Sequence, residues 1–154
     1  MKKFGKILVA VLIFGLLVVI PAAAQKTKAD FQKMYMDFLK KKKMECKITN
    51  DGGVSFMTPE GSGYYIIINE NEPQRFCVYT FVHLAGHPMG TTMQLANTAN
   101  SNTRCVKISI SDDGEYAFFI FQGVLPKPKD FSLVFDKILA TIDDTVWYFV
   151  DLFN

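Results

Sequence analysis

Residues 95–122 read LANTANSNTRCVKISISDDGEYAFFIFQ, and this stretch decides the fold that the sequence predicts. Three asparagines among small residues mark the end of a short helix over about 91–101. Apolar and polar residues then alternate over 104–111, which is typical of a half-buried strand. After the turn-forming DDG, residues 116–121 return as a strand that is apolar on both faces. The stretch therefore predicts a helix followed by an antiparallel hairpin.

The sequence on either side of this stretch predicts two more helices and two more hairpins. Apolar residues recur at helical spacing over 28–43 and again over about 130–152. Four segments between turn residues have the composition of strands: 45–49, 54–58, 64–69 and 75–84. The predicted order is α-ββ-ββ-α-ββ-α, with an N-terminal helix, a short middle helix and a long C-terminal helix. Hairpins imply an antiparallel sheet covered by helices, which is an α+β fold.

The middle helix carries several expectations for single residues. Thr91 or Thr92 is expected to cap its first turn. Met93, Ala96 and Ala99 are expected to face the sheet, where the two small alanines permit close approach.

The three asparagines have different expected roles. Asn100 and Asn102 fall at the end of the helix, where asparagine bonds readily to nearby backbone or takes the left-handed conformation. Asn97 lies one turn inside the helix and is the remaining candidate for a functional role, either bonding to the sheet or facing solvent. Replacing Asn97 with alanine is expected to cost stability more than binding.

The first 24 residues have the pattern of a secretory signal peptide. A basic start is followed by an apolar run over 7–20 and by PAAA, which predicts cleavage between Ala24 and Gln25. A retained membrane anchor is the alternative, but a bilayer span takes roughly 20 apolar residues. We therefore expect a periplasmic or secreted protein with one α+β domain over residues 25–154 and no stable membrane anchor after cleavage.

The charge of the processed chain argues against nucleic acid as a partner. The full chain has 17 basic and 15 acidic residues, and the leader contains three of the lysines and no acid. Residues 25–154 then carry 14 basic and 15 acidic residues, a net charge of −1, which gives no electrostatic basis for binding nucleic acid.

Three cysteines, Cys46, Cys77 and Cys105, leave the disulfide question open. An exported chain can hold a disulfide, but three cysteines cannot all pair within one molecule. The spacing contains no CxxC, so neither a zinc site nor a redox pair is indicated. Buried, unpaired cysteines are the favoured interpretation over a bridge.

No catalytic, metal or cofactor motif is apparent in the sequence. His83 and His87 have the spacing of two zinc ligands on one helix, but Gly86 and Pro88 exclude helical geometry there. The segment EGSGY lacks the spacing of a nucleophile elbow, and the glycine-rich turns lack the Lys-Ser/Thr of a phosphate loop. We expect a protein that is not an enzyme and that carries no cofactor and no metal.

One family resemblance rests on three features of the second half of the chain. These are the helix ending in alanine and asparagine, the hairpin TRCVKISISDDGEYAFFIFQGVL, and, after a Pro/Lys connector, the helix DFSLVFDKILATIDDTVWYFVDLF. Together they resemble the YbjN-like family, which is described as bacterial sensory-transduction regulators and has a fold similar to the type III secretion chaperones. The resemblance implies a noncatalytic α+β domain, often dimeric, that binds another protein.

Two functions remain open from the sequence. The first is an exported, noncatalytic protein-binding or chaperone-like module, expected to be a homodimer, with an unknown protein partner. The alternative is a small-ligand-binding periplasmic domain with a pocket between sheet and helices. The aromatic candidates for the lining of such a pocket are Tyr64, Tyr65, Tyr79 and Trp147.

The candidate binding residues are Asn97, Tyr79, Trp147 and Tyr148. Trp147 and Tyr148 extend the apolar stripe of the C-terminal helix, and packing is their favoured role. A residual apolar strip on that helix would instead indicate a partner surface.

Overall fold

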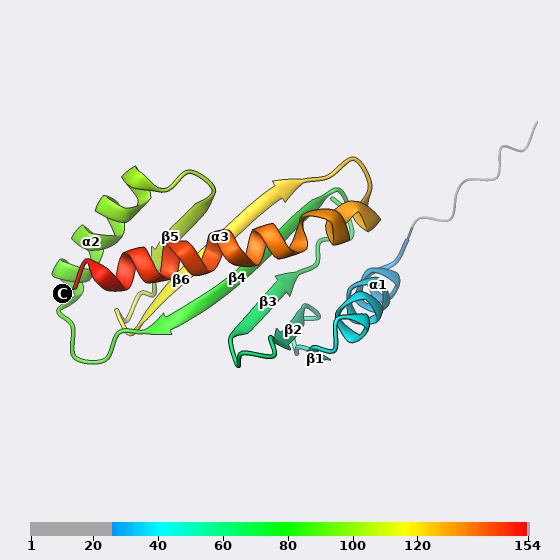
Figure 1. Ribbon diagram of the computed structural model, residues 1–154, viewed down its shortest axis with the longest axis horizontal. Coiled ribbons are helices and arrows are strands. Elements are labelled where there is room, and N and C mark those ends of the chain that lie inside the picture. Colours follow the sequence, from blue (N-terminus) through cyan, green and yellow to red (C-terminus); the bar gives the residue numbers. More distant parts are fainter. Residues whose placement is uncertain (1–25, 154) are drawn as a thin grey trace, which may run out of the picture.

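A six-stranded antiparallel sheet and three long helices make up residues 26–153, which are the residues described by this computed structural model (Figure 1). The predicted signal peptide and its cleavage site lie outside these residues. The elements are α1 (Lys28–Lys41), β1 (Glu45–Ile48), β2 (Val54–Met57), β3 (Gly63–Ile67), β4 (Arg75–His83), α2 (Met89–Asn102), β5 (Val106–Ile110), β6 (Tyr116–Val124), the 3-10 turn η1 (Pro128–Asp130) and α3 (Phe131–Asp151). The predicted element order and α+β class are confirmed.

The sheet has the strand order β1-β2-β3-β4-β6-β5. Strand β6 pairs with β4 along its whole length, from Arg75 opposite Val124 to His83 opposite Tyr116. The chain reaches β5 through α2 and then returns along β6 into the centre, so β5 becomes an edge strand.

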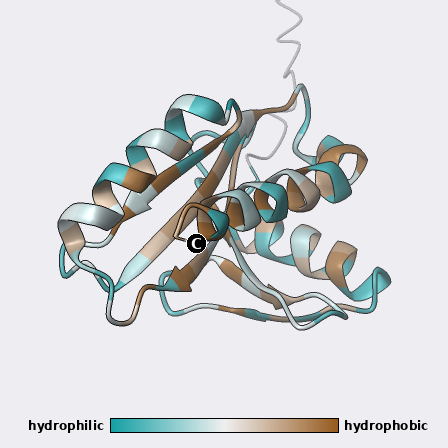
Figure 2. Ribbon diagram, turned by 60° about the vertical axis from the view of Figure 1, so that its left-hand side comes forward, coloured by the Kyte–Doolittle hydropathy of each residue, from teal (hydrophilic) through white to brown (hydrophobic). Residues whose placement is uncertain are grey.

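All three helices cover the same face of the sheet. Helix α1 packs on β1 and β2, α2 packs on β5, and α3 crosses β6, β4 and β5. Figure 1 shows α3 lying across the strands, with α1 near one end of the sheet and α2 near the other. The hydropathy colouring in Figure 2 shows that each helix mixes apolar and polar residues along its length. None of the helices in the described part of the chain is long and apolar enough to span a bilayer.

Helix α1 has well-defined ends. At its start Thr27 and Asp30 form a capping box, in which each side chain bonds to the backbone N–H of the other residue. At its end Lys43 takes the left-handed conformation, with a φ of 61°. This allows Met44 to donate its backbone N–H to the carbonyl of Leu39 at 3.1 Å, which closes a Schellman motif.

Helix α3 contributes the centre of the core. Its buried stripe includes Phe135, Ile142 and Phe149, and the ring of Phe149 packs edge-on against Phe119 of β6 at 5.5 Å. The stripe follows the helical spacing read from the sequence, so the predicted packing face is the one observed.

Helix α2 starts earlier than the sequence suggested. Its N-cap is Pro88, and no side chain caps the first turn. Thr92 is fully buried and donates its hydroxyl to the carbonyl of Pro88 at 3.1 Å, so the expected threonine cap was wrong. Ala96 and Ala99 face the sheet as predicted, but Met93 is 48% exposed and does not.

Candidate functional site

The second face of the sheet has no helix packed on it within residues 26–153. Side chains alternate between the two faces along a strand. On β4, Phe76 and Val78 are buried under the helices, whereas Cys77 and Tyr79 are half-buried and Phe81 is 41% exposed on the other side. We call this second side the open face.

The open face carries a cluster of ring contacts that spans β3, β4 and β6. Tyr65 stacks on Tyr79 with ring centroids 5.0 Å apart and lies 6.0 Å from Phe81. Phe81 in turn contacts Tyr116 at 5.5 Å and Phe118 at 6.0 Å. We call these five residues the aromatic ridge. Stacked and edge-to-face contacts of this kind are the geometries that aromatic pairs prefer.

Two hollows of similar size flank the ridge. One, of about 340 Å³, lies over β1 to β3 and is bounded by Lys47, Met57 and Tyr65. Gly63 in the same hollow has no side chain, and the sulfur of Met57 lies 3.3 Å from where a Cβ would be placed. The other, of about 350 Å³, lies over the far ends of β3, β4 and β6 and is bounded by residues that include Ile67. Both hollows are open to solvent, so neither is an enclosed cavity.

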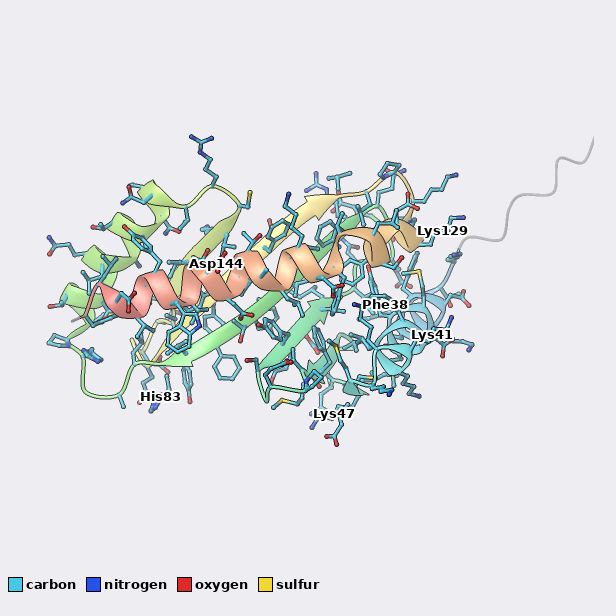
Figure 3. All side chains as sticks on the ribbon, viewed as in Figure 1. Phe38, Lys41, Lys47, His83, Lys129 and Asp144 are labelled. Carbon is cyan, nitrogen blue, oxygen red and sulfur yellow. The ribbon has the colours of Figure 1, made fainter. Side chains whose placement is uncertain are left out.

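Polar and charged residues frame the open face. Tyr65 and Tyr79 are in register with Lys47 on β1 and with Lys107 on β5, so a lysine stands at each end of this row. Figure 3 shows Lys47 and His83 along the same margin of the molecule, away from α3. An apolar centre with a polar margin is the usual anatomy of a contact surface between proteins.

Burial shifts the pKa of two titratable groups on the open face. Burial raises the pKa of the Tyr79 phenol, and the nearby Asp51 carboxylate raises it further. Burial also raises the pKa of the Cys77 thiol, although a hydrogen bond from Gln122 partly offsets this. Both groups are therefore neutral at ordinary pH, and the thiol has little nucleophilic character.

The structure separates the four candidate binding residues. Tyr79 lies on the aromatic ridge. Trp147 and Tyr148 lie on α3, on the opposite side of the sheet, and are 67% and 37% exposed. Packing was therefore the wrong interpretation for Trp147, because the helix is covered on only one side. Asn97 is exposed on α2 and does not bond to the sheet.

Asn100, not Asn97, connects α2 to the sheet. Its side-chain amide donates to the carbonyl of Ile108 at 2.9 Å and accepts the N–H of Ile108 at 2.7 Å. Asn102 donates to the carbonyl of Thr98, as expected for an asparagine that bonds to nearby backbone at a helix end. Of the two positions expected for Asn97, the structure shows the one that faces solvent, and the bond to the sheet is made by Asn100.

The four aromatic residues proposed to line a ligand pocket do not share one. Tyr64 faces the helices, stacks on Phe56 at 5.4 Å and donates its hydroxyl to Asp143 of α3. Its pKa is raised by burial and by this bond to a carboxylate. Tyr65, the next residue, points to the open face because side chains alternate.

A different hollow does lie between sheet and helix. It measures about 330 Å³ and is formed by β6, β4 and α3. Its lining residues include Phe121, Leu125, Val134 and Ile138, so its walls are mostly apolar.

The histidines and cysteines do not form a site. His83 contacts the Tyr116 ring at 5.1 Å and His87 contacts the Phe153 ring at 4.4 Å. Across residues 26–153 there is no group of three His, Cys, Asp or Glu side chains that could hold a metal ion. All three cysteines are free; Cys46 and Cys77 are half-buried and Cys105 is exposed.

Three ridge residues were not among the candidates predicted from the sequence: Phe81, Tyr116 and Phe118. Tyr65 was predicted to line a pocket, not to lie on a surface. Tyr65, Tyr116 and Phe118 lie on strands with apolar residues on both faces. Strands of this kind normally have both faces covered. Their apolar residues on both faces were therefore the sequence signal for a second contact surface.

Comparisons with known proteins identify the fold. No family model matches the sequence, and no curated protein matches it. Among solved structures, an uncharacterized protein from Methanothermobacter thermautotrophicus has a TM-score of 0.56 at 8% identity and covers 80% of this chain and 99% of its own. YbjN from E. coli has a TM-score of 0.53 at 10% identity, covering 77% and 87% of the two chains.

The type III secretion chaperone SycH from Yersinia pestis is also similar, with a TM-score of 0.44 at 10% identity over 75% of this chain and 98% of its own. The structural neighbours thus include YbjN, as the sequence resemblance predicted. The likeness to YbjN establishes the fold, and it is the fold alone that these low identities show: the chain is an α+β protein with the architecture of YbjN.

Proposed function

We propose that the chain is an exported, noncatalytic protein-binding module that forms a homodimer through its open face. The observation that carries this proposal is the aromatic ridge, which stands on a sheet face without a covering helix. Ile67 beside the ridge is 47% exposed and Met57 is 44% exposed. Contiguous exposed apolar surface of this kind is costly in water and marks an interaction site.

The size of the open face suits a second copy of the chain. The six strands contain 36 residues, which at about 3.3 Å per residue and about 4.8 Å per strand cover roughly 570 Å². Two such faces in contact bury on the order of 1,100 Å², which exceeds the roughly 1,000 Å² expected of a specific interface.

The shape and charge of the face also permit self-association. The ridge of one copy has hollows of about 340 and 350 Å³ beside it, into which apolar side chains of the other copy can pack. The net charge of −1 expected for residues 25–154 means that two copies repel one another very little at long range. A two-fold contact between identical patches is also the commonest arrangement of soluble oligomers.

Measuring the solution mass tests the dimer. The chain from Gln25 to Asn154, which contains every described element, is analysed by sedimentation equilibrium over a range of concentrations. We expect twice the chain mass for this protein and for Leu133→Lys, a control that places a lysine on the outer side of α3, where Leu133 is 81% exposed. Phe81→Lys, on the ridge, should raise the dissociation constant of the dimer at least tenfold. A monomer at all concentrations would refute the proposal.

Export rests on the first 24 residues and has its own test. Mass spectrometry of the protein recovered from the cell envelope should find Gln25 as the first residue. Recovery of an intact Met1 would refute signal cleavage.

The small-ligand alternative has a limited basis. The hollows reach the volume of ligand pockets, roughly 300 Å³, but those beside the ridge are open and the one between β6 and α3 has few polar groups. An apolar small molecule that copurifies with the protein and can be extracted from it would support this alternative.

A further inference from the structure

We propose that the hollow between the end of β6 and α3 binds a medium-chain fatty acid, with its carboxylate at Lys137 and its aliphatic chain between helix and sheet. We call this site the α3 hollow. It lies on the helical side of the sheet, opposite the open face. The proposal therefore goes beyond the homodimer contact and holds whether or not two copies of the chain associate.

The α3 hollow lies where β5 has ended and β6 continues. Strand β5 begins at Val106 opposite Phe121, whereas β6 runs on to Val124. Beyond Val106, helix α3 still covers β6 and β4, and a space of about 330 Å³ remains at the margin of the sheet. The hollow is thus a consequence of how the helix and the strands are arranged, not of one loop.

The walls of the α3 hollow are mostly apolar. Phe76 and Phe121 line it from the sheet, with their rings stacked and the ring centroids 5.9 Å apart. Gly123 allows the Phe76 ring to lie close to β6, because an added Cβ would be only 2.5 Å from it. Val134 and Ile138 line the hollow from α3. Filling this space with hydrocarbon removes apolar side chains from water, which is favourable.

One face of α3 supplies apolar wall and positive charge together. Val134, Lys137, Ile138 and Thr141 follow the i, i+3, i+4, i+7 spacing of a single helix face. The Thr141 hydroxyl already donates to the carbonyl of Lys137 at 2.7 Å, so it needs no bond from a ligand. The side chains that line the hollow include one cation, Lys137, and no carboxylate.

Lys137 determines the charge and the orientation of the ligand. Its side chain is exposed, whereas the neighbouring Ile138 is only 2% exposed. Among residues 26–153, Lys137 has no ion-pair partner. A ligand with a carboxylate on the solvent side and a hydrocarbon chain toward Ile138 complements this arrangement, and a cationic amphiphile would be repelled.

The dimensions of the hollow favour one chain of medium length. From Val134 to Thr141 the helix advances about 10 Å, at roughly 1.5 Å per residue. An extended octanoate chain is roughly 9 Å long. The volume of about 330 Å³ is near the lower limit of ligand pockets, roughly 300 Å³. A free fatty acid therefore fits better than the two chains of a phospholipid.

Isothermal titration calorimetry with the chain from Gln25 to Asn154 measures the binding. We expect octanoate to bind saturably and hexanoate to bind at least fivefold more weakly, because burying one methylene changes affinity roughly fourfold. Octylamine has a chain of the same length and the opposite charge, and it should bind at least tenfold more weakly than octanoate. No binding of octanoate, or equal binding of octylamine, would overturn the proposal.

The three free cysteines report which hollow is occupied, because each hollow contains one of them. Cys105 lines the α3 hollow, and Cys46 and Cys77 line the two hollows beside the aromatic ridge. Saturating octanoate should slow alkylation of Cys105 by a maleimide at least fivefold and that of the other two less than twofold, as located by mass spectrometry. Protection of Cys46 or Cys77 without protection of Cys105 would place the ligand on the open face and contradict the proposed site.

Two pairs of variants test the apolar wall and the cation. Val134→Trp fills the hollow and should weaken octanoate binding at least tenfold, whereas Leu133→Trp, at a position 81% exposed on the outer side of α3, should change it less than twofold. Lys137→Glu should weaken octanoate binding at least tenfold and abolish the preference over octylamine, and Lys47→Glu on the open face should do neither. If Val134→Trp fails to fold, the lysine pair still decides. Octanoate binding that Lys137→Glu leaves intact would overturn the proposal.

The alkylation assay also separates a free fatty acid from the tail of a membrane lipid. Dioctanoyl phosphatidylglycerol carries chains of the same length on an anionic head group. We expect half-maximal protection of Cys105 to require at least tenfold more of this phospholipid than of octanoate. Protection by the phospholipid at a lower concentration than by octanoate would assign the hollow to a membrane lipid, and the fatty-acid proposal would be wrong.

Discussion

The side-chain amide of Asn100 makes both backbone hydrogen bonds of Ile108, at 2.9 and 2.7 Å, as a neighbouring strand would. Ile108 is the central residue of β5, an edge strand. One asparagine thus satisfies the outward N–H and C=O of the edge and fixes α2 beside it. The same contact blocks the middle of β5 from pairing with another chain.

Asn100→Ala should destabilise the protein by about 2 kcal/mol, because two hydrogen bonds of a half-buried site are lost together. The matched control is Asn97→Ala, three residues earlier on the exposed side of α2, which should change stability by less than about 0.5 kcal/mol. Urea denaturation of both variants measures the difference. Equal effects of the two substitutions would contradict the structural role given to Asn100.

Lys43→Gly should stabilise the protein by about 1 kcal/mol, since a residue with a Cβ is strained in the left-handed conformation that Lys43 adopts at the end of α1. Lys41→Gly, inside the last turn of the same helix, should destabilise by a similar amount because glycine disfavours helical backbone. Thermal denaturation of the two variants should give shifts of opposite sign. A loss of stability in Lys43→Gly would show that its side chain has a favourable role that exceeds the strain.

The buried phenol of Tyr35 should make the protein less stable at high pH. Burial raises the pKa of its phenol from 10.0 to about 12. The folded protein therefore holds this proton more tightly than the unfolded chain. The resulting stability is fully present below pH 10 and is lost as the pH rises toward 12 and beyond, at up to about 1.4 kcal/mol per pH unit.

Tyr35→Phe removes this titration and leaves that of Tyr64 in place. Between pH 10 and 12 the variant should lose less stability than the wild type, as measured by urea denaturation at each pH. Parallel pH profiles for the two proteins would mean that the Tyr35 phenol does not titrate differently in the folded state.

Trp147 gives a direct optical test of the exposed side of α3, because it is the one tryptophan of the chain. At 67% exposure its fluorescence should be red-shifted and readily quenched by iodide. Trp147→Ser should change the unfolding free energy by less than about 0.5 kcal/mol. A blue-shifted emission that iodide does not quench would place Trp147 in a contact, either within the chain or between copies.

The element order was predictable because most elements have a clear period. Val106, Ile108 and Ile110 alternate with polar residues, and the stripe of α3 repeats every three or four residues. Helix starts were less predictable: α2 begins at Met89 after the N-cap Pro88, with no side-chain cap, while Thr92 is buried. The local sequence does not distinguish a threonine that caps a helix from one that is buried in its first turn.

The candidate site was much less predictable. Strand β6 is apolar on both faces, so its sequence does not show which side the helices cover. That choice depends on its pairing with β4, which lies more than thirty residues away in the chain. The role of Asn100 likewise depends on a contact with Ile108 across two elements, whereas Asn97 has the same local surroundings in sequence.

The most direct test of the open face as the homodimer contact is photo-cross-linking in the cell envelope. Ile67→benzoylphenylalanine places the cross-linker beside the aromatic ridge, and Leu133→benzoylphenylalanine places it on the outer side of α3. Irradiation should convert the first variant to a product of twice the chain mass and leave the second as a monomer. A doubled mass from position 133 and none from position 67, or a cross-link from position 67 to a different protein alone, would contradict the account.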